Sequence, residues 1–285
     1  MGIIVGLINA ATVGLLDVFL KKLKGLNPNF LTLLRMASAV PALAILVTVF
    51  SRWTIPPRPF WMLVLLVSVP LEIFLAFLTT KALQMAPLSL MAPLGAFSSI
   101  FLIPVGYLVL GELPTRLGVV GVLLIFIGSF FLGWKVSEDK LRYGLSNVLR
   151  EPGSYVAILG AFVASITVTV AKFTFHYAPP LLSAFYLTSL MGLALLPLLF
   201  MQSRGAIRMR GRDVLGLMVM SGSGIALHYT GLSLISMVYY ISIKRLSTVI
   251  NVVWGRLFFR EDHTRERLAG AAFMAAGVIL IAFAS

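Results

Sequence analysis

The chain has 285 residues, of which 59% are hydrophobic and 12% are charged, with a formal net charge of +13 at pH 7. A soluble domain of this length cannot bury so much apolar surface in one core, so the composition excludes an ordinary soluble enzyme and indicates a lipid-facing chain. The chain contains no cysteine, which excludes disulfides, thiolate metal sites and a cysteine nucleophile.

Apolar runs follow one another along the whole sequence, each near the length of about 20 residues that crosses a bilayer. Read between charged or Pro- and Gly-rich breaks, they predict ten transmembrane helices at residues 2–20, 29–50, 59–80, 86–110, 115–134, 153–175, 180–202, 213–232, 235–258 and 266–284. The runs are too long for barrel strands. We therefore expect an all-α integral membrane protein that crosses the inner (plasma) membrane many times. The first run has no basic leader and is expected to be a retained helix.

The second half of the sequence repeats the first. A shift of 149 residues superimposes nine identical residues: Leu83 on Leu232, Ser98 on Ser247, Gly106 on Gly255, Leu108 on Leu257, Glu112 on Glu261, Thr115 on Thr264, Arg116 on Arg265, Gly121 on Gly270 and Gly128 on Gly277. A shift of 151 residues aligns the starts of the halves, for example Ser38 with Ser189. We predict a first five-helix repeat at 1–134, a connecting loop at 135–152 and a second repeat at 153–285. Five is an odd number, so the second repeat is inverted, as in secondary transporters.

Two segments resemble the drug/metabolite transporter (DMT) superfamily, and within it the EamA-type ten-helix transporters: KALQMAPLSLMAPLGAFSSIFLIPVGYLVLGELPTRLGVVGVLLIFIGSFFLG and its echo ISIKRLSTVINVVWGRLFFREDHTRERLAGAAFMAAGVILIAF. Leu110, Gly111 and Glu112, followed by Gly121 and Gly128, form the family-like core. The resemblance implies a helical bundle with a central cavity, and a transporter or exporter of small metabolites. It leaves the substrate open.

The distribution of Lys and Arg bears on orientation. Most of them lie in the five connections on one side of the predicted bundle, whereas the side with both termini has only Arg52, Arg58 and Arg116. The positive-inside rule then places both termini outside. The family resemblance favours both termini in the cytoplasm, so the orientation stays open.

Two adjacent cations in the predicted ninth helix are the strongest candidates for a substrate site. Lys244 and Arg245 lie about ten residues into an apolar helix, where a charge costs at least about 2.5 kcal/mol unless it has a partner or a wet cavity. Lys244 shares a helical stripe with Tyr240, Ser247 and Asn251. A guanidinium and an ammonium together favour an anionic group on the substrate. The alternative is a buried ion pair with Asp17 or Glu72.

Further polar residues in the predicted spans complete the candidate site. Tyr239, His228 and Glu72 are additional substrate-binding candidates. Glu72 follows Pro70 and is also a candidate for proton coupling, as is Asp17, whose simpler explanation is a local pair with Lys21. Glu112 is repeated as Glu261, each with a Thr three residues later, which predicts a capping role at the next helix.

No P-loop, zincin helix, nucleophile elbow or dinucleotide fingerprint is present, so we expect no enzyme activity, cofactor or metal. The leading prediction is a secondary transporter or exporter that moves a small anionic or zwitterionic metabolite by alternating access. A flippase for a lipid-linked phosphate or sugar is the second reading, and a non-transporting membrane scaffold or intramembrane enzyme is the third. The expected partners are the small-molecule or lipid-linked substrate and membrane lipids, without nucleic acid, for a monomer or homodimer.

Overall fold

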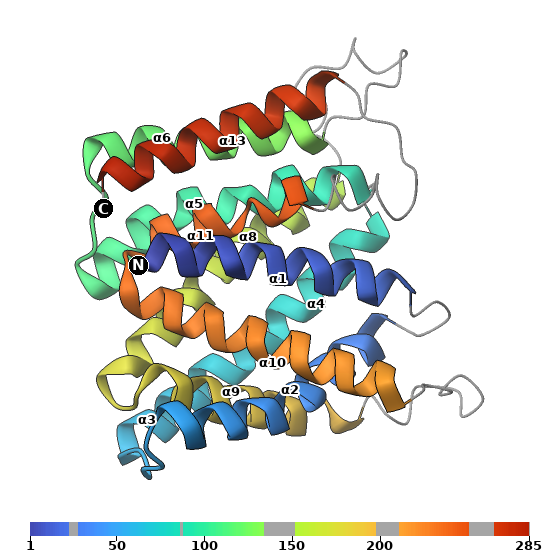
Figure 1. Cartoon of the computed structure of the whole chain (residues 1–285), viewed down its shortest axis with the longest axis vertical. Coiled ribbons are helices and arrows are strands. Elements are labelled where there is room, and N and C mark those ends of the chain that lie inside the picture. The colour runs from blue at the N-terminus through green and yellow to red at the C-terminus, as the bar shows by residue number, and fades with distance from the viewer. Residues whose placement is uncertain (23–27, 86–87, 134–151, 198–210, 251–264, 285) are drawn as a thin grey trace. The chain divides into compact units, whose positions relative to one another are not determined.

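The computed structural model describes residues 1–22, 28–85, 88–133, 152–197, 211–250 and 265–284 (Figure 1). These residues form helices and short connections, and no β-strand occurs among them. The prediction of an all-α chain is confirmed. By its internal contacts the chain divides into two compact units. Each unit draws its helices from both halves of the sequence, so the units are not the two sequence repeats.

The first unit comprises residues 1–70 and 170–234. Its elements are α1 (Gly2–Lys22), α2 (Pro28–Phe50), α3 (Arg58–Leu63), the π-helix η1 (Val64–Ser68), the 3-10 helix η2 (Thr174–His176), α9 (Pro180–Ala194) and α10 (Gly211–Leu234). α2 and α9 pack antiparallel, because Leu33 shares a cluster with Met191, whereas Val47 shares another with Leu182. The 151-residue shift relates these two helices, and an inverted repeat requires such equivalents to run in opposite directions.

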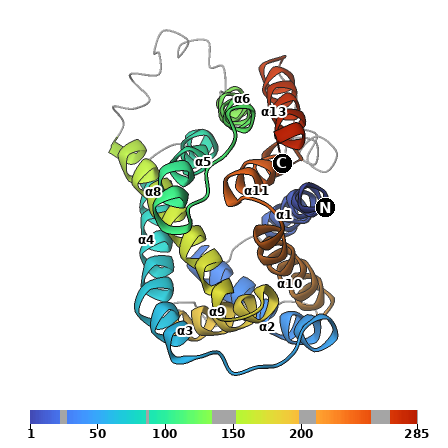
Figure 2. The ribbon, with the colours of Figure 1, turned by 90° about the vertical axis from the view of Figure 1, so that its left-hand side faces the viewer.

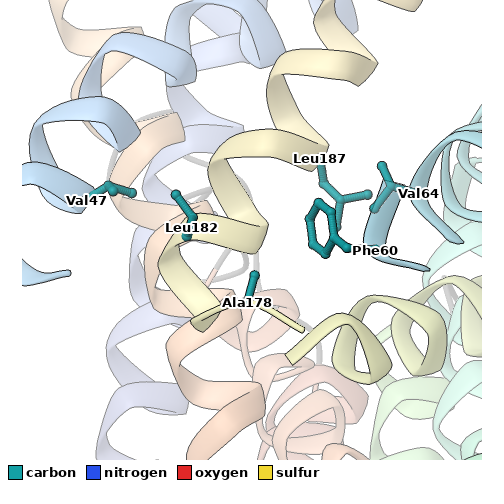
Figure 3. Close-up of a cluster of buried hydrophobic side chains, with 6 residues drawn as sticks. All are labelled: Val47, Phe60, Val64, Ala178, Leu182 and Leu187. Carbon is teal, nitrogen blue, oxygen red and sulfur yellow. The ribbon is translucent and has the colours of Figure 1, made fainter. Parts of the chain in front are cut away.

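A cluster of buried side chains joins α9 to the short helix α3 in this first unit (Figure 3). Phe60 is fully buried, and Figure 3 shows it beside Leu187 of α9 and Val64 of η1. Lipid is as apolar as the interior of a protein, so the cluster gains little from leaving the solvent. Close packing and dispersion contacts are what it contributes to helix association.

The second unit comprises residues 71–169 and 235–285. Its helices are α4 (Val69–Met85), α5 (Leu88–Leu110), α6 (Arg116–Gly133), α8 (Pro152–Phe173), α11 (Met237–Lys244) and α13 (Arg265–Ala284). Two of them, α4 and α8, extend a few residues past the boundary that separates the units.

α6 and α13 lie side by side within the second unit, as Figures 1 and 2 both show. A Cβ on Gly121 would lie 2.7 Å from the Gly277 carbonyl oxygen, and a Cβ on Gly128 would lie 2.6 Å from that of Gly270. The small residues let the two backbones touch. The 149-residue shift relates Gly121 to Gly270 and Gly128 to Gly277. The pairing is therefore reciprocal and antiparallel, as expected for repeats of opposite orientation.

A π-helical turn interrupts the continuous helix that runs from α3 through η1 to α4. The N–H of Val69 bonds to the carbonyl of Val64, five residues back, and Pro70 follows immediately. Proline has no N–H and its ring clashes with the carbonyl four residues earlier, so a wider turn relieves the clash. The Ser68 hydroxyl reaches the Leu63 carbonyl at 3.5 Å. This helix therefore has fewer regular backbone bonds just before Glu72 than elsewhere.

The predicted helix boundaries agree with the structure at most ends, with one clear exception in the first unit. The helix expected at 180–202 ends as an α-helix at Ala194, where residue 195 forms a turn and residues 196–197 are 3-10 helical. Pro197 supplies the reason, because proline cannot donate a helical hydrogen bond and restricts the residue before it. The predicted connecting loop at 135–152 lies, except for Pro152, outside the described residues.

Three stretches among the described residues are long and apolar enough to cross a membrane: Thr32–Phe50, Arg58–Ala82 and Pro152–His176. Shorter apolar helices are Gly2–Asp17, Leu94–Leu110, Arg116–Leu132, Pro180–Ala194 and Ala269–Ala284. Large apolar side chains stand on the surface, such as Leu108 and Phe283, each 79% exposed. Such side chains on apolar helices suit contact with lipid tails.

Candidate functional site

α11 carries the predicted cations at its end, and its first turn is held by a carboxylate from the other half of the sequence. Met237 is the first residue of α11, and its N–H donates to Glu112 Oε2 at 3.1 Å. The N–H groups of a first helical turn have no partner within the helix. A negative charge there also interacts favourably with the positive end of the helix dipole. Glu112 was predicted to cap the next helix; the observed bond makes it a cap of α11.

The Leu110–Gly111–Glu112 sequence directs that carboxylate by ending α5 in a tight turn. Gly111 has φ 69°, a conformation that costs residues with a Cβ atom more than glycine. The N–H of Gly111 donates to the Tyr107 carbonyl at 3.0 Å, and that of Glu112 to the Gly106 carbonyl at 3.3 Å. The turn gives carbonyls at the end of α5 hydrogen-bond partners and reverses the chain. Glu112 therefore lies in the turn, directly after the end of the helix.

Tyr239 links α11 to the start of α6. Its hydroxyl accepts the backbone N–H of Thr115 at 2.8 Å and lies 3.2 Å from the Thr115 hydroxyl. Thr115 Oγ1 in turn accepts the N–H of Gly118 at 3.1 Å, which is an N-cap of α6. The ring of Tyr239 lies where a Cβ on Gly118 would be. The structure gives Tyr239 this packing and capping role, and its predicted contact with substrate stays a prediction.

Arg245 reaches from the end of α11 to the interior of α5. Its Nη2 donates to the Gly95 carbonyl oxygen and to Ser98 Oγ, both at 2.5 Å. A Cβ on Gly95 would lie 3.2 Å from Arg245 Nη1, so the absence of a side chain there makes room for the guanidinium. Among the described residues, the hydrogen-bond partners of Arg245 are neutral oxygens of α5. These bonds orient the cation without neutralising its charge.

The contacts fix the register of α5 against α11. A Cβ on Gly106 would meet the side chain of Met237, while Gly95 lies at Arg245, so the two helices run antiparallel. This register places Ser242 near the level of Ser99. Among the residues that the structure describes, these two buried hydroxyls have no hydrogen-bond partner, although most serine and threonine hydroxyls in such helices bond to a carbonyl three or four residues earlier.

The predicted stripe on the ninth helix is interrupted just after Lys244. Arg245 and Leu246 form a turn, in which the Leu246 N–H donates to the Ile243 carbonyl at 2.9 Å. Bonds to the third residue back tighten the helix, so positions after the turn no longer follow one regular stripe. Tyr240 is fully buried, whereas Lys244 and Ser247 are half-buried. Asn251 lies outside the described residues.

The remaining predicted residues lie on other helices. Glu72 is half-buried in the first turn of α4, in the second unit. Asp17 is exposed on α1, and His228 is half-buried on α10 with its ring edge-on to Tyr229, centroids 5.7 Å apart; both belong to the first unit. In the residues that the structure describes, no group of three or more His, Asp or Glu side chains could hold a metal ion.

Sequence reasoning did not select Gly95 or Ser98 as site residues. The signal that could have pointed to Ser98 is its identity with Ser247 under the 149-residue shift, since Ser247 was already a candidate. The role of Gly95 has no such signal, because it acts through a backbone carbonyl that every residue carries.

No curated protein matches the chain. A solved structure described only as "Crystal structure of protein" matches with a TM-score of 0.79 and 14% sequence identity, over 100% of this chain and 99% of that chain. At this identity the match shows the fold alone.

The family to which the chain belongs is shown by a family model, because the solved structure shows only the fold. The model of the EamA-like transporter family matches residues 1–134 and again residues 151–283. The chain therefore belongs to the EamA-like transporter family, as a multi-pass membrane protein with two EamA repeats that functions in transport and is not an enzyme.

Proposed function

We propose that this chain is a secondary transporter that moves a small anionic or zwitterionic metabolite across the membrane by alternating access. The observation that carries the proposal is the guanidinium of Arg245, held by two neutral oxygens of α5. Family membership supports transport in general, and the nature of the cargo follows from the chemistry of this cation.

A charged side chain within a membrane helix is costly, by at least about 2.5 kcal/mol on insertion scales. A carbonyl and a hydroxyl satisfy two N–H groups of Arg245, yet they leave its full positive charge. A carboxylate or phosphate on a substrate would supply the opposite charge through charge-assisted hydrogen bonds. Lys244, the next residue along, adds a second cation of compact shape. The two residues together favour an anion over a neutral sugar or a cation.

Alternating access is supported by the antiparallel pairing of equivalent helices within each unit. α6 and α13 meet through reciprocal glycines, and α5 runs opposite to α11. Repeats of opposite orientation can exchange their conformations, which opens one binding site first to one face of the membrane and then to the other. We place the repeats at residues 1–134 and 153–285, joined by 135–152, with Glu72 and Asp17 as the candidates for ion coupling.

The test begins with purified protein and a panel of amino acids, nucleotides, sugar phosphates and polyprenyl phosphates. A compound that binds the folded state raises the melting temperature. The stabilising compound is then radiolabelled and its uptake into proteoliposomes is measured for the wild type, Lys244→Ala and Arg245→Ala. Arg52→Ala, an exposed arginine after α2, is the matched control for loss of a cation.

We expect stabilisation by a soluble anion or zwitterion, loss of uptake in both α11 variants and unchanged uptake in Arg52→Ala. Wild-type flux in Lys244→Ala and Arg245→Ala would remove these residues from the mechanism. Stabilisation by polyprenyl phosphates alone would contradict a small-metabolite cargo and favour the flippase reading.

A further inference from the structure

The guanidinium of Arg245 is fixed to α5 by a buried serine. Ser98 lies in the middle of α5, is 3% exposed, and accepts a hydrogen bond from Arg245 Nη2. The neighbouring bond from the same nitrogen goes to the Gly95 carbonyl, one helical turn earlier. Both contacts come from the first repeat, while Arg245 belongs to the second.

We propose that Ser98 is a positioning residue, which holds the Arg245 guanidinium in the orientation that binds the oxyanion of the substrate. The inference rests on the proposed function, because it assigns to Arg245 the role of anion binding. An arginine side chain has many rotamers, and those that cannot reach a ligand lower its affinity. A hydroxyl that fixes the side chain beforehand removes most of that loss.

The nitrogen of Arg245 that bonds to α5 determines which N–H groups of the guanidinium are left for a ligand. Nη2 has two N–H groups, and the two bonds to α5 occupy that nitrogen. A guanidinium has five N–H groups in all. As far as the structure describes the chain, the two N–H groups on Nη1 and the one on Nε remain for a ligand. The Ser98 hydroxyl accepts the hydrogen bond from Nη2, and it acts on the ligand through Arg245.

Gly95 contributes through its missing side chain. A Cβ at this position would lie 3.2 Å from Nη1 and 3.8 Å from Nη2. The 3.2 Å contact is tighter than nine in ten real Cβ contacts, so an alanine would shift the guanidinium by a few tenths of an ångström while leaving the Ser98 hydroxyl in place. Gly95→Ala thus displaces the cation by a route independent of Ser98→Ala.

The chain offers a matched control in Ser129 of α6. Ser129 is 1% exposed and belongs to the same unit as Ser98, but its hydroxyl donates to the Phe126 carbonyl of its own helix at 2.7 Å. Ser129→Ala therefore removes an equally buried hydroxyl without touching Arg245. Ser98→Thr is the conservative variant, since it keeps a hydroxyl on the same carbon.

The experiment measures binding of two defined probes, L-glutamate for carboxylates and glucose 6-phosphate for phosphates, by calorimetry on purified protein. For the probe that binds the wild type, we expect Ser98→Ala and Gly95→Ala to weaken binding about tenfold, the order for losing a hydrogen bond to a charged group. Ser98→Thr should stay within about twofold by the same reasoning, and Ser129→Ala should match the wild type. In an Arg245→Ala background, Ser98→Ala should have no further effect, because the two residues act as one.

A second measurement needs no ligand. Phenylglyoxal modifies arginine, and mass spectrometry reports the rate at each position. We expect Arg245 to react faster in Ser98→Ala than in the wild type or Ser129→Ala, with exposed Arg52 as the internal reference.

The outcomes separate the two proposals. If neither probe binds the wild type, or if Arg245→Ala binds as the wild type does, the anion site itself is overturned and the role of Ser98 falls with it. If the wild type binds and Arg245→Ala does not, but Ser98→Ala leaves both affinity and Arg245 reactivity unchanged, the positioning role alone is overturned. An equal loss from Ser98→Ala in the presence and absence of Arg245 would overturn it too.

Discussion

Gly128 of α6 and Gly270 of α13 approach each other reciprocally: a Cβ added to either would lie 2.6 Å from the carbonyl oxygen of the other. No real Cβ contact is this short, so neither position has room for even a methyl group. The pair is therefore a sensitive place to test how closely equivalent helices of the two repeats pack.

Gly128→Ala should force α6 away from α13 and lower the free energy of unfolding by about 1–3 kcal/mol, the usual cost of overpacking. Thermal unfolding in detergent, followed by tryptophan fluorescence, measures the change. The control is Gly160→Ala in α8, where a Cβ would lie at an ordinary 3.8 Å from Leu78 Cβ. Helix propensity favours alanine over glycine at both positions, so an equal loss in both variants would show that the α6–α13 contact does not account for the effect.

Gly111→Ala should destabilise the turn at the end of α5 by about 1–2 kcal/mol, because φ 69° is strained for a residue with a Cβ. Apart from its chain neighbours, no atom of the described residues lies within 4 Å of the added carbon, so the cost comes from the backbone and not from a clash. In the described part of the chain, Gly211→Ala also meets nothing within 4 Å, and the φ of Gly211 is not positive, so this variant should be neutral in the same unfolding assay. A neutral Gly111→Ala would contradict the left-handed turn.

Tyr239→Phe removes the hydroxyl that accepts the Thr115 N–H. We expect a loss of about 0.5–1.5 kcal/mol in unfolding free energy, typical of one hydrogen bond. Thr115→Val should cost a similar amount, and the double variant should cost less than the sum, because the residues share one network. Strict additivity would argue against the network.

The same variants tested in uptake assays decide whether Tyr239 also contacts the cargo. If it does, the apparent affinity for the cargo falls in Tyr239→Phe and not in Thr115→Val.

The π-helical turn at 64–68 should be the most readily opened part of the helix from α3 to α4. Pro70→Ala restores an N–H and removes the clash that widens the turn. Hydrogen exchange of peptides covering residues 64–72 should then slow by roughly tenfold, which corresponds to about 1.4 kcal/mol of local stability. Pro41→Ala, inside the α-helical α2, should leave these peptides unchanged. Exchange as fast in Pro70→Ala as in the wild type would mean that proline does not cause the π turn.

The helices could be predicted closely because each one is a run of apolar residues of defined length, and because both repeats carry the same spacing of Gly, Thr and Glu. The end of α9 at Ala194 was within reach too, since Pro197 stands three residues later. The turn at Arg245 and Leu246 was not, because no proline or glycine precedes it and the local residues favour helix.

The candidate site shows a different limit. Lys244 and Arg245 stand out as charges in an apolar run, so sequence alone selects them. Their surroundings depend on which helices pack together. The contact from Arg245 to Ser98 spans 147 residues, and the contact to Gly95 uses a backbone oxygen. The bond from Met237 to Glu112 likewise requires the knowledge that α11 starts where α5 ends.

The composition of the two units has a consequence for synthesis. The ribosome delivers α1 and α2 long before α9 and α10, yet the first unit needs all four, so it stays unfinished until about residue 234 has emerged. A fragment cut between the repeats would hold half the helices of each unit and complete neither. The two fragments would become stable only by associating with each other in opposite orientations in the membrane. Two separate copies of a single five-helix chain would assemble in the same way.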